Sequence, residues 1–309
     1  FLDPFAPSDT FVNLNVLWLK AIAGNSRDRH MSDGGLSFDM LPPFSRNVVR
    51  WPLCTLFPPL LHQNIALRNK FLDSASQEQI NLHSAQGKRV IVVHLGSGFD
   101  TRSFRLRNAT SHIEIDLPSV CEQKQRLLQH RLLPRRPHLA SSLPTVLPTD
   151  LNDVDASLAA LQETLSSLRS APLASSLPPP GALNPASDQH APPSSTPQEK
   201  PSNLAQQEET GAPPSLHILL VSEAVLLYLK EGKAEDLILS CARLAAHNHA
   251  SFSFCFSDRI PVARVGGAAE DEAAQVLLAQ AGLELEAWFK RQSLTRHLGV
   301  AVARQRPAA

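Results

Sequence analysis

The sequence predicts an α/β protein with a parallel sheet, and three observations support that prediction. Residues 90–93 read VIVV, a run of β-branched residues that is typical of a strand buried on both faces. Residues 88–150 alternate between strand-like and helix-like segments, as βαβ units do. Residues 154–169 repeat apolar side chains at helical spacing, which predicts an amphipathic helix. A chain of 309 residues is long enough to bury such a core.

We expect residues 1–75 to form a helical cap on a single domain. Apolar side chains recur between Phe11 and Leu19 at the spacing of an amphipathic helix. The pairs Gly34-Gly35 and Pro42-Pro43 punctuate this region with turns. The core of the domain is then expected at residues 88–170 and 215–309.

A segment of unusual composition interrupts the predicted core. Residues 171–215 hold 11 of the 25 prolines and no Val, Ile, Phe, Tyr or Trp. Such a segment cannot bury enough apolar surface to offset the entropy lost on ordering, so we predict a disordered insert at 171–214. After it the sequence predicts a strand at 216–221, a helix at 231–246, a half-buried strand at 251–256, a helix at 269–282 and a final strand at 294–304.

Two glycines and a distant carboxylate indicate a site for a nucleotide-type cofactor. Gly96 and Gly98 follow the first strand, where missing side chains let a ligand approach the backbone. Asp116 ends the next strand, where a carboxylate can accept hydrogen bonds from both hydroxyls of a ribose. The alternatives are a plain tight turn at the glycines and, for Asp116, an acid in a surface turn before Pro118.

Four ordered segments resemble the signature motifs of the leucine carboxyl methyltransferase family. They read LGSGFDTRSFRL at 95–106, EIDLP at 114–118, DLNDV at 150–154 and SEAVLLYL at 222–229. The resemblance extends over nearly the whole chain outside the insert and a divergent stretch at 20–55. It implies the seven-stranded sheet of class I (Rossmann-like) methyltransferases, with flanking helices, and S-adenosylmethionine as the cofactor.

The resemblance also implies roles for individual residues. Arg68 would pair with the carboxylate of the cofactor, and Glu223 would lie close to the cofactor at the end of a strand. Asp150 would accept the adenine amino group while Leu151 packs on the ring. Tyr228, the only tyrosine of the chain, would orient the carboxyl group of the acceptor. The alternatives are a surface arginine, a helix start at Glu223, a helix N-cap at Asp150 and a core aromatic.

The residues after the glycine turn are expected to begin a helix. For Asp100 and Thr101 we favour a capping or turn role over catalysis. Arg102 is a weaker candidate for contact with a substrate carboxylate. His247 and His249 form an H-x-H pair, but no recognised metal-ligand spacing accompanies it, so we predict no metal site.

Composition limits the remaining possibilities. The 29 basic and 29 acidic residues cancel, so no global charge attracts nucleic acid or acidic membranes. Four scattered cysteines without a C-x-x-C pair predict reduced, mostly buried thiols in a cytoplasmic protein. No apolar run reaches the ~18 residues of a membrane span.

By resemblance, the expected activity is methylation of the C-terminal leucine carboxylate of the protein phosphatase 2A catalytic subunit. The C-terminal tail of that subunit would be the partner, and we expect this protein to be a monomer. A carboxylate is already deprotonated at neutral pH, so the reaction needs no general base. The alternatives are a related methyltransferase acting on a small-molecule or wybutosine-tRNA carboxylate, and a non-catalytic cofactor-binding homologue. The neutral charge disfavours tRNA.

Overall fold

The computed structural model describes residues 8–25, 33–50, 59–170, 215–258, 260, 270–289 and 297–303. These residues contain a seven-stranded sheet in the order β3-β2-β1-β4-β5-β7-β6. Its strands are β1 (Arg89–Leu95), β2 (Ser111–Asp116), β3 (Thr145–Pro148), β4 (Leu216–Glu223), β5 (Ser251–Asp258), β6 (Leu283–Phe289) and β7 (His297–Ala303).

Five neighbouring strands are parallel, and β7 runs antiparallel between β5 and β6. From β1 the chain builds outward first to β2 and β3, and later to β4 and β5 on the other side. Ligands bind α/β sheets at such a switch point, beyond the carboxyl ends of the strands. The expected α/β fold with the seven-stranded class I sheet is therefore confirmed.

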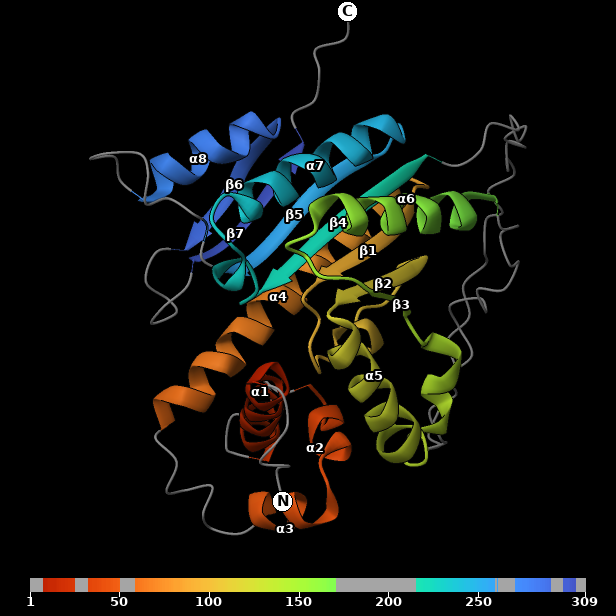
Figure 1. The fold of residues 1–309 in the computed structure, drawn as a ribbon, viewed down its shortest axis with the longest axis vertical. Helices are drawn as coiled ribbons and strands as arrows, with labels where there is room; N and C mark the ends of the chain where they lie inside the picture. Colours follow the sequence, from red (N-terminus) through yellow and green to blue (C-terminus); the bar gives the residue numbers. More distant parts are fainter. Residues whose placement is uncertain are drawn as a thin grey trace, which may run out of the picture.

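Helices cover both faces of the sheet (Figure 1). The long helix α4 (Pro59–Ala85) contacts β1, β4, β5 and β7 on one face. On the other face, α7 (Lys233–His247) contacts β5, α6 (Val154–Ser170) contacts α7, and α8 (Glu270–Gln280) contacts β6. An apolar core lies on each face of the sheet. Alternate residues of β1 belong to one core or the other, because successive side chains of a strand point to opposite faces.

A third apolar cluster holds the N-terminal cap together. It joins α1 (Ser8–Asn25), α2 (Leu36–Met40) and α3 (Pro43–Arg50) to α5 (Pro118–Leu127) and the turns that follow α5. Figure 1 shows these helices on the side toward which the parallel strands point. The expected boundary at residue 75 falls inside α4, a continuous helix that belongs to the sheet as much as to the cap.

The segments around α5 are less regular than expected. The helix predicted after the glycine turn is only a 3-10 turn, η3 (Arg102–Phe104), and the side chain of Thr101 makes no capping hydrogen bond there. Beyond α5, the chain continues into a π-helical turn, η4 (Leu128–Leu132), and a second 3-10 helix, η5 (Pro137–Ser142). A last 3-10 turn, η6 (Leu226–Tyr228), follows β4.

Two expectations about late strands were wrong. The alternation of Ser and Phe in β5 predicted a half-buried strand, but every residue from Phe252 to Asp258 is buried. Ser253 is tolerated inside because its hydroxyl has a polar partner, His217 Nε2, at 3.0 Å. No strand was expected between the helix at 269–282 and the final strand at 294–304, but residues 283–289 form β6. It forms a sheet edge through pairing with β7.

The predicted insert at 171–214 lies outside the described residues.

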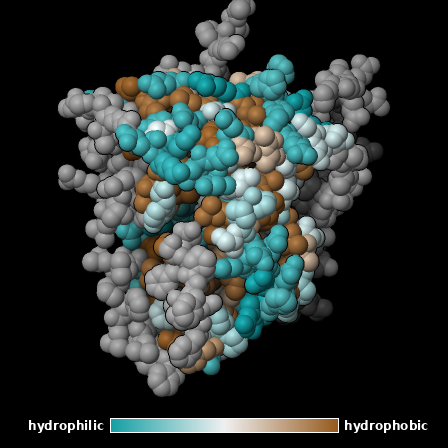
Figure 2. Space-filling model, viewed as in Figure 1, coloured by the Kyte–Doolittle hydropathy of each residue, from teal (hydrophilic) through white to brown (hydrophobic). Residues whose placement is uncertain are grey.

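On the face shown in Figure 2, hydrophilic residues cover most of the upper helical layer, and hydrophobic residues show between them. Among the described helices, none has the length and hydropathy needed to cross a membrane. Cys121, Cys241 and Cys255 are free and buried, as expected for reduced thiols.

Candidate functional site

A cavity of about 400 Å³ lies at the carboxyl ends of the parallel strands, beneath α1. Its volume is within the range of ~300–1,000 Å³ that is usual for small-molecule sites. All eight residues that the sequence singled out line this cavity: Arg68, Gly96, Gly98, Asp116, Asp150, Leu151, Glu223 and Tyr228. The fold therefore brings together residues from α4, from two strand ends and from three turns.

Both glycines of the turn after β1 are required by the backbone. Gly96 has φ 54° and Gly98 has φ 48°, which is the left-handed region that side chains disfavour. A Cβ atom on Gly96 would also overlap the side chain of Val225, and one on Gly98 would overlap Asn13 of α1. The turn thus lies tightly between the cap and the segment after β4, as part of the cavity wall.

Asp116 ends β2 and faces the cavity. Its Oδ2 accepts a hydrogen bond from Gly98 N at 2.6 Å, and its Oδ1 accepts one from Leu117 N at 2.8 Å. Burial raises the pKa of this carboxyl, while the two backbone donors act in the opposite direction. Each oxygen keeps a lone pair for a further donor. The alternative of a simple surface turn is therefore wrong.

Asp150 and Leu151 lie on the turn after β3. Leu151 is buried, whereas Asp150 is exposed and accepts hydrogen bonds from the backbone N and the side-chain amide of Asn152 at 2.9 and 3.0 Å. The residue that caps α6 is Asp153, whose carboxylate accepts a bond from Ala156 N at 3.1 Å. The N-cap alternative for Asp150 is therefore wrong.

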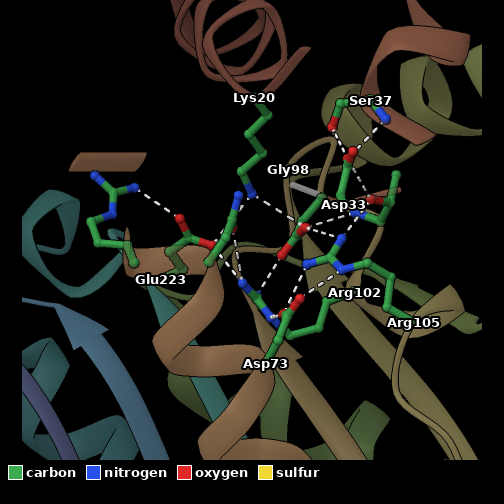
Figure 3. A network of polar contacts seen from close by, with 12 residues as sticks. Lys20, Asp33, Ser37, Asp73, Gly98, Arg102, Arg105 and Glu223 are labelled. Atoms are coloured by element: carbon green, nitrogen blue, oxygen red, sulfur yellow. Dashed lines mark hydrogen bonds and ion pairs between the residues drawn. The ribbon is translucent and has the colours of Figure 1, made fainter. Parts of the chain in front are cut away.

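Glu223 is the centre of a buried ion-pair cluster (Figure 3). Its Oε1 accepts a bond from Arg68 Nη2 at 2.8 Å, and its Oε2 lies 2.9 Å from Arg102 Nη2 and 3.4 Å from Lys20 Nζ. Burial alone would raise the pKa of the Glu223 carboxyl, but the three cations outweigh burial and hold the pKa well below its ordinary value. Glu223 is therefore an anion at neutral pH.

The cluster continues through Arg102, which also lines the cavity. This guanidinium pairs with Asp100 and with Asp73, and Asp73 also holds Arg105 at 2.8 Å. A guanidinium is planar and presents five N–H donors in a fixed geometry, so its partners must be placed to match those directions. Arg102 is thus engaged by protein carboxylates, and Asp100 has an ion-pair role rather than the expected capping role, although its Oδ1 also accepts the turn hydrogen bond from Thr101 N.

Arg68 has hydrogen-bonding capacity left over. It is 5 % exposed, so the alternative of a surface arginine is wrong. Among the described residues, its buried Nε has no hydrogen-bond partner. An unsatisfied buried donor on a cation is costly, and a bound anion would remove that cost.

Lys20 is a site residue that sequence reasoning missed. Figure 3 shows its side chain reaching from α1 toward Glu223. It is 4 % exposed, lines the cavity and also lies 3.2 Å from Asp100 Oδ1. The available signal was its spacing: Lys20 follows Leu17 by three residues, so it shares the apolar face of the helix.

Two more polar residues of the cavity wall were not identified from sequence, His94 and Glu114. Burial lowers the pKa of His94 well below its usual value, so its ring is neutral, and its Nε2 lies 3.2 Å from His112 Nδ1. Glu114 pairs with the buried Lys124 at 2.7 Å and accepts a bond from Ser103 Oγ at 2.8 Å.

Tyr228 stands at the mouth of the cavity. It is the last residue of η6 and is 60 % exposed, so the alternative of a core aromatic is wrong. Over the part of the chain that the structure describes, no group of three or more His, Cys, Asp or Glu side chains could hold a metal ion.

Comparison with known proteins places part of the chain beside one family. Residues 55–177 match the leucine carboxyl methyltransferase family. The matched segment contains Arg68, the glycine turn, Asp116 and the Asp150-Leu151 pair, and it covers less than half of the chain. It bears out the family expected from the motifs, and with it a methyltransferase that uses S-adenosylmethionine.

Solved methyltransferase structures resemble the chain only distantly. Magnesium protoporphyrin IX methyltransferase from Synechocystis, solved with bound S-adenosylmethionine, is 12% identical with a TM-score of 0.42, over 97% of this chain and 99% of that one. The bifunctional kinase-methyltransferase WbdD is 14% identical with a TM-score of 0.41, over 78% of this chain and 40% of that one. No curated protein sequence matches the chain significantly.

Proposed function

We propose that the protein transfers a methyl group from S-adenosylmethionine to the C-terminal leucine carboxylate of the protein phosphatase 2A catalytic subunit. The observation that carries the proposal is the convergence of Arg68, Gly98, Asp116 and Glu223 on one cavity. The first three lie within the segment that matches the leucine carboxyl methyltransferase family. When bound, the cofactor supplies an electrophilic methyl group on a sulfonium.

The cation cluster suits the amino-acid end of the cofactor. Arg68 would use its free Nε to bind the carboxylate, with Lys20 beside it. Glu223 keeps its negative charge and supplies the counter-charge for the ammonium and sulfonium groups. Because these charges are buried, their interactions with a ligand are stronger than they would be in water.

The nucleoside end of the cofactor would lie along β2 and β3. Asp116 would accept the two ribose hydroxyls with the lone pairs that the backbone donors leave free. Asp150 would accept the adenine amino group, and the buried Leu151 would pack against the ring. We therefore expect Asp116→Ala to lower cofactor affinity by about tenfold to a hundredfold, which corresponds to roughly 1.5–3 kcal/mol.

The acceptor half of the proposal rests on Tyr228. Its exposed ring can meet a peptide carboxylate at the mouth of the cavity, and its hydroxyl can orient the attacking oxygen. The acceptor is already ionised at neutral pH, so the residues need only align it and exclude water. The absence of a general base from this proposal follows from the acceptor's chemistry.

The test is a transfer assay with isotopically labelled cofactor and purified phosphatase 2A core, run beside tRNA and free carboxylic acids. We expect label on the phosphatase, and about tenfold to a hundredfold less transfer by Asp116→Ala when the cofactor is limiting. Label found only on tRNA or only on small acids would show that the acceptor is that molecule and not the phosphatase. Calorimetry that detects no cofactor binding by the parent protein would overturn the proposal as a whole.

Tyr228→Phe sharpens the acceptor assignment. The phenyl ring fills the same space, so cofactor affinity should stay within about twofold, while turnover should fall by about tenfold to a hundredfold because one hydrogen bond made mainly at the transition state is lost. Turnover equal to that of the parent would remove Tyr228 from the reaction.

A further inference from the structure

Residues 224–230 form a turn at the cavity mouth, which we call the rim turn. It includes η6 and carries Tyr228. Ala224 begins it with φ 61°, a backbone conformation that a residue with a side chain rarely adopts. Strain of this kind persists only where surrounding contacts enforce it, and it concentrates at functional sites.

A single buried carboxylate holds the start of the rim turn. Asp258, the last residue of β5, is fully buried, and its Oδ2 accepts three hydrogen bonds. The donors are Ser222 Oγ at 2.6 Å, Val225 N at 2.8 Å and Leu226 N at 3.0 Å. One oxygen thus holds two successive backbone donors of the rim turn as well as a hydroxyl.

The neighbouring contacts fix the rest of the turn. Ala224 N donates to Ser257 O at 3.0 Å, and Tyr228 N donates to Val225 O at 2.9 Å. At the far end, Lys230 N donates to Asn152 Oδ1 at 2.8 Å. The backbone that carries Tyr228 is therefore tied to β5 at one end and to the turn after β3 at the other.

Asp258 itself does not line the cavity. Its effect on a ligand must therefore be indirect. We propose that Asp258 is a positioning residue, whose carboxylate sets the rim turn so that Tyr228 faces the acceptor before the acceptor binds. The expected effect of Asp258 on catalysis rests on the proposed function. Its effect on the placement of Tyr228 can be measured without any reaction.

Preorganisation is the physical reason for using a carboxylate here. Three donors converge on one oxygen, which suits a charged acceptor better than the oxygen of a neutral amide. A turn that already has its bound conformation does not lose conformational entropy when the acceptor arrives. Removal of the carboxylate should thus affect the acceptor step and spare the cofactor half of the cavity.

The sequence offers a clean reporter for this test, because Tyr228 is the only tyrosine. The 309-residue protein grown with 3-fluorotyrosine should give a single fluorine resonance, from the rim turn. We expect Asp258→Ala to shift or broaden that resonance, Asp258→Asn to give an intermediate result, and Ser222→Ala to give the smallest change because both backbone bonds to Asp258 survive. Asp39→Asn, which breaks a 2.9 Å pair with Arg136 away from the cavity, is the control for destabilisation as such.

The kinetic readout separates positioning from general support. Asp258→Ala should raise the acceptor KM or lower kcat by about tenfold, while calorimetric cofactor affinity stays within about twofold of the parent. Asp258→Asn should recover part of the loss.

An unchanged fluorine resonance in both Asp258 variants, or a cofactor affinity that falls as much as turnover, would overturn the inference. Should Asp258→Ala fail to fold, Asp258→Asn and Ser222→Ala decide it. Failure of the parent to methylate any acceptor would instead count against the proposed function, and the fluorine spectra would still decide the role of Asp258.

Discussion

The two ends of the sheet bury ionisable groups in opposite ways. At the carboxyl end, Glu223 lies among Lys20, Arg68 and Arg102, and these neighbours hold its carboxyl in the anionic form. At the amino end, His217 in β4 is fully buried and is held in its neutral form. Both clusters belong to the same strand.

The partners explain the contrast. His217 lies between two hydroxyls, with Ser251 Oγ at 2.9 Å and Ser253 Oγ at 3.0 Å, and it stacks on His83 with ring centroids 3.5 Å apart. Burial, with the nearby charges of His83 and Lys88, lowers the pKa of His217 to about 2. No described carboxylate compensates for a charge there, whereas at the carboxyl end each buried charge has an opposite partner.

The difference teaches how the fold separates stability from function. A buried cluster of compensated charges can accept a charged ligand by exchanging partners, since its groups are already ionised and oriented. A neutral, hydroxyl-paired histidine at the other end offers only packing and short-range hydrogen bonds. The charged end is also where the cavity and the eight predicted residues lie.

The largest expected effect comes from breaking the charged end. Glu223→Gln leaves Lys20, Arg68 and Arg102 without their shared carboxylate, and we expect the free energy of unfolding at pH 7 to fall by about 3–5 kcal/mol. Denaturant titration measures this. The control is Glu122→Gln, which removes an exposed pair with Arg126 and should cost less than about 1 kcal/mol. Equal effects in the two variants would contradict the contrast.

Acid should expose the neutral end. The pKa of His217 is lower in the folded than in the unfolded protein, so below pH 6.5 the unfolded state binds more protons. Stability should therefore fall as pH drops from 6.5 toward 4, by about 1.4 kcal/mol per pH unit for this histidine. His217→Asn should flatten the fall measured by denaturant titration. The slope that remains in this variant comes from other histidines with lowered pKa values, such as the buried His94 and the half-buried His112. The exposed His247→Asn should keep the parent's slope.

A matched pair of glycines sharpens the comparison further. Gly98 and Gly87 both have positive φ, but a Cβ atom on Gly98 would overlap Asn13, whereas one on Gly87, at the amino end, would meet nothing within 4 Å. Each Gly→Ala change should cost about 1 kcal/mol of backbone strain. Only Gly98→Ala should also weaken cofactor binding, by about tenfold or more, as measured by calorimetry. Equal cofactor affinity in the two variants would remove Gly98 from the site.

The smallest effect is expected at the insert. The described chain leaves α6 and re-enters β4 at the amino end of the sheet, where Arg89 N donates to Ser215 O at 2.9 Å. Deletion of residues 174–212 should change the melting temperature and the cofactor affinity very little, because loop closure depends weakly on length and the segment lacks core residues. A melting temperature lowered by several degrees would show that the insert packs on the domain.

Sequence patterns predicted the cavity well because its chemistry is local to strand ends. Asp116 and Glu223 each end a strand, and the carboxyl ends of parallel strands meet at one edge of a sheet. Strand β6 and the full burial of β5 were harder, because they depend on β7, which adds to the sheet antiparallel from the far end of the chain.

What the sequence by itself determined is the α/β class, the strand-end positions of the carboxylates and the glycines that the turn requires. Only the tertiary structure decided the charge arrangement. Lys20 and Glu223 are 203 residues apart, and Arg68 and Glu223 are 155 apart, so no local pattern joins them. The same holds for Asp258, whose carboxylate supports the rim turn from a neighbouring strand. The physical reason is that propensities and hydrophobic periodicity act over a few residues, whereas the pKa of a buried group depends on every charge that the fold brings within a few ångströms.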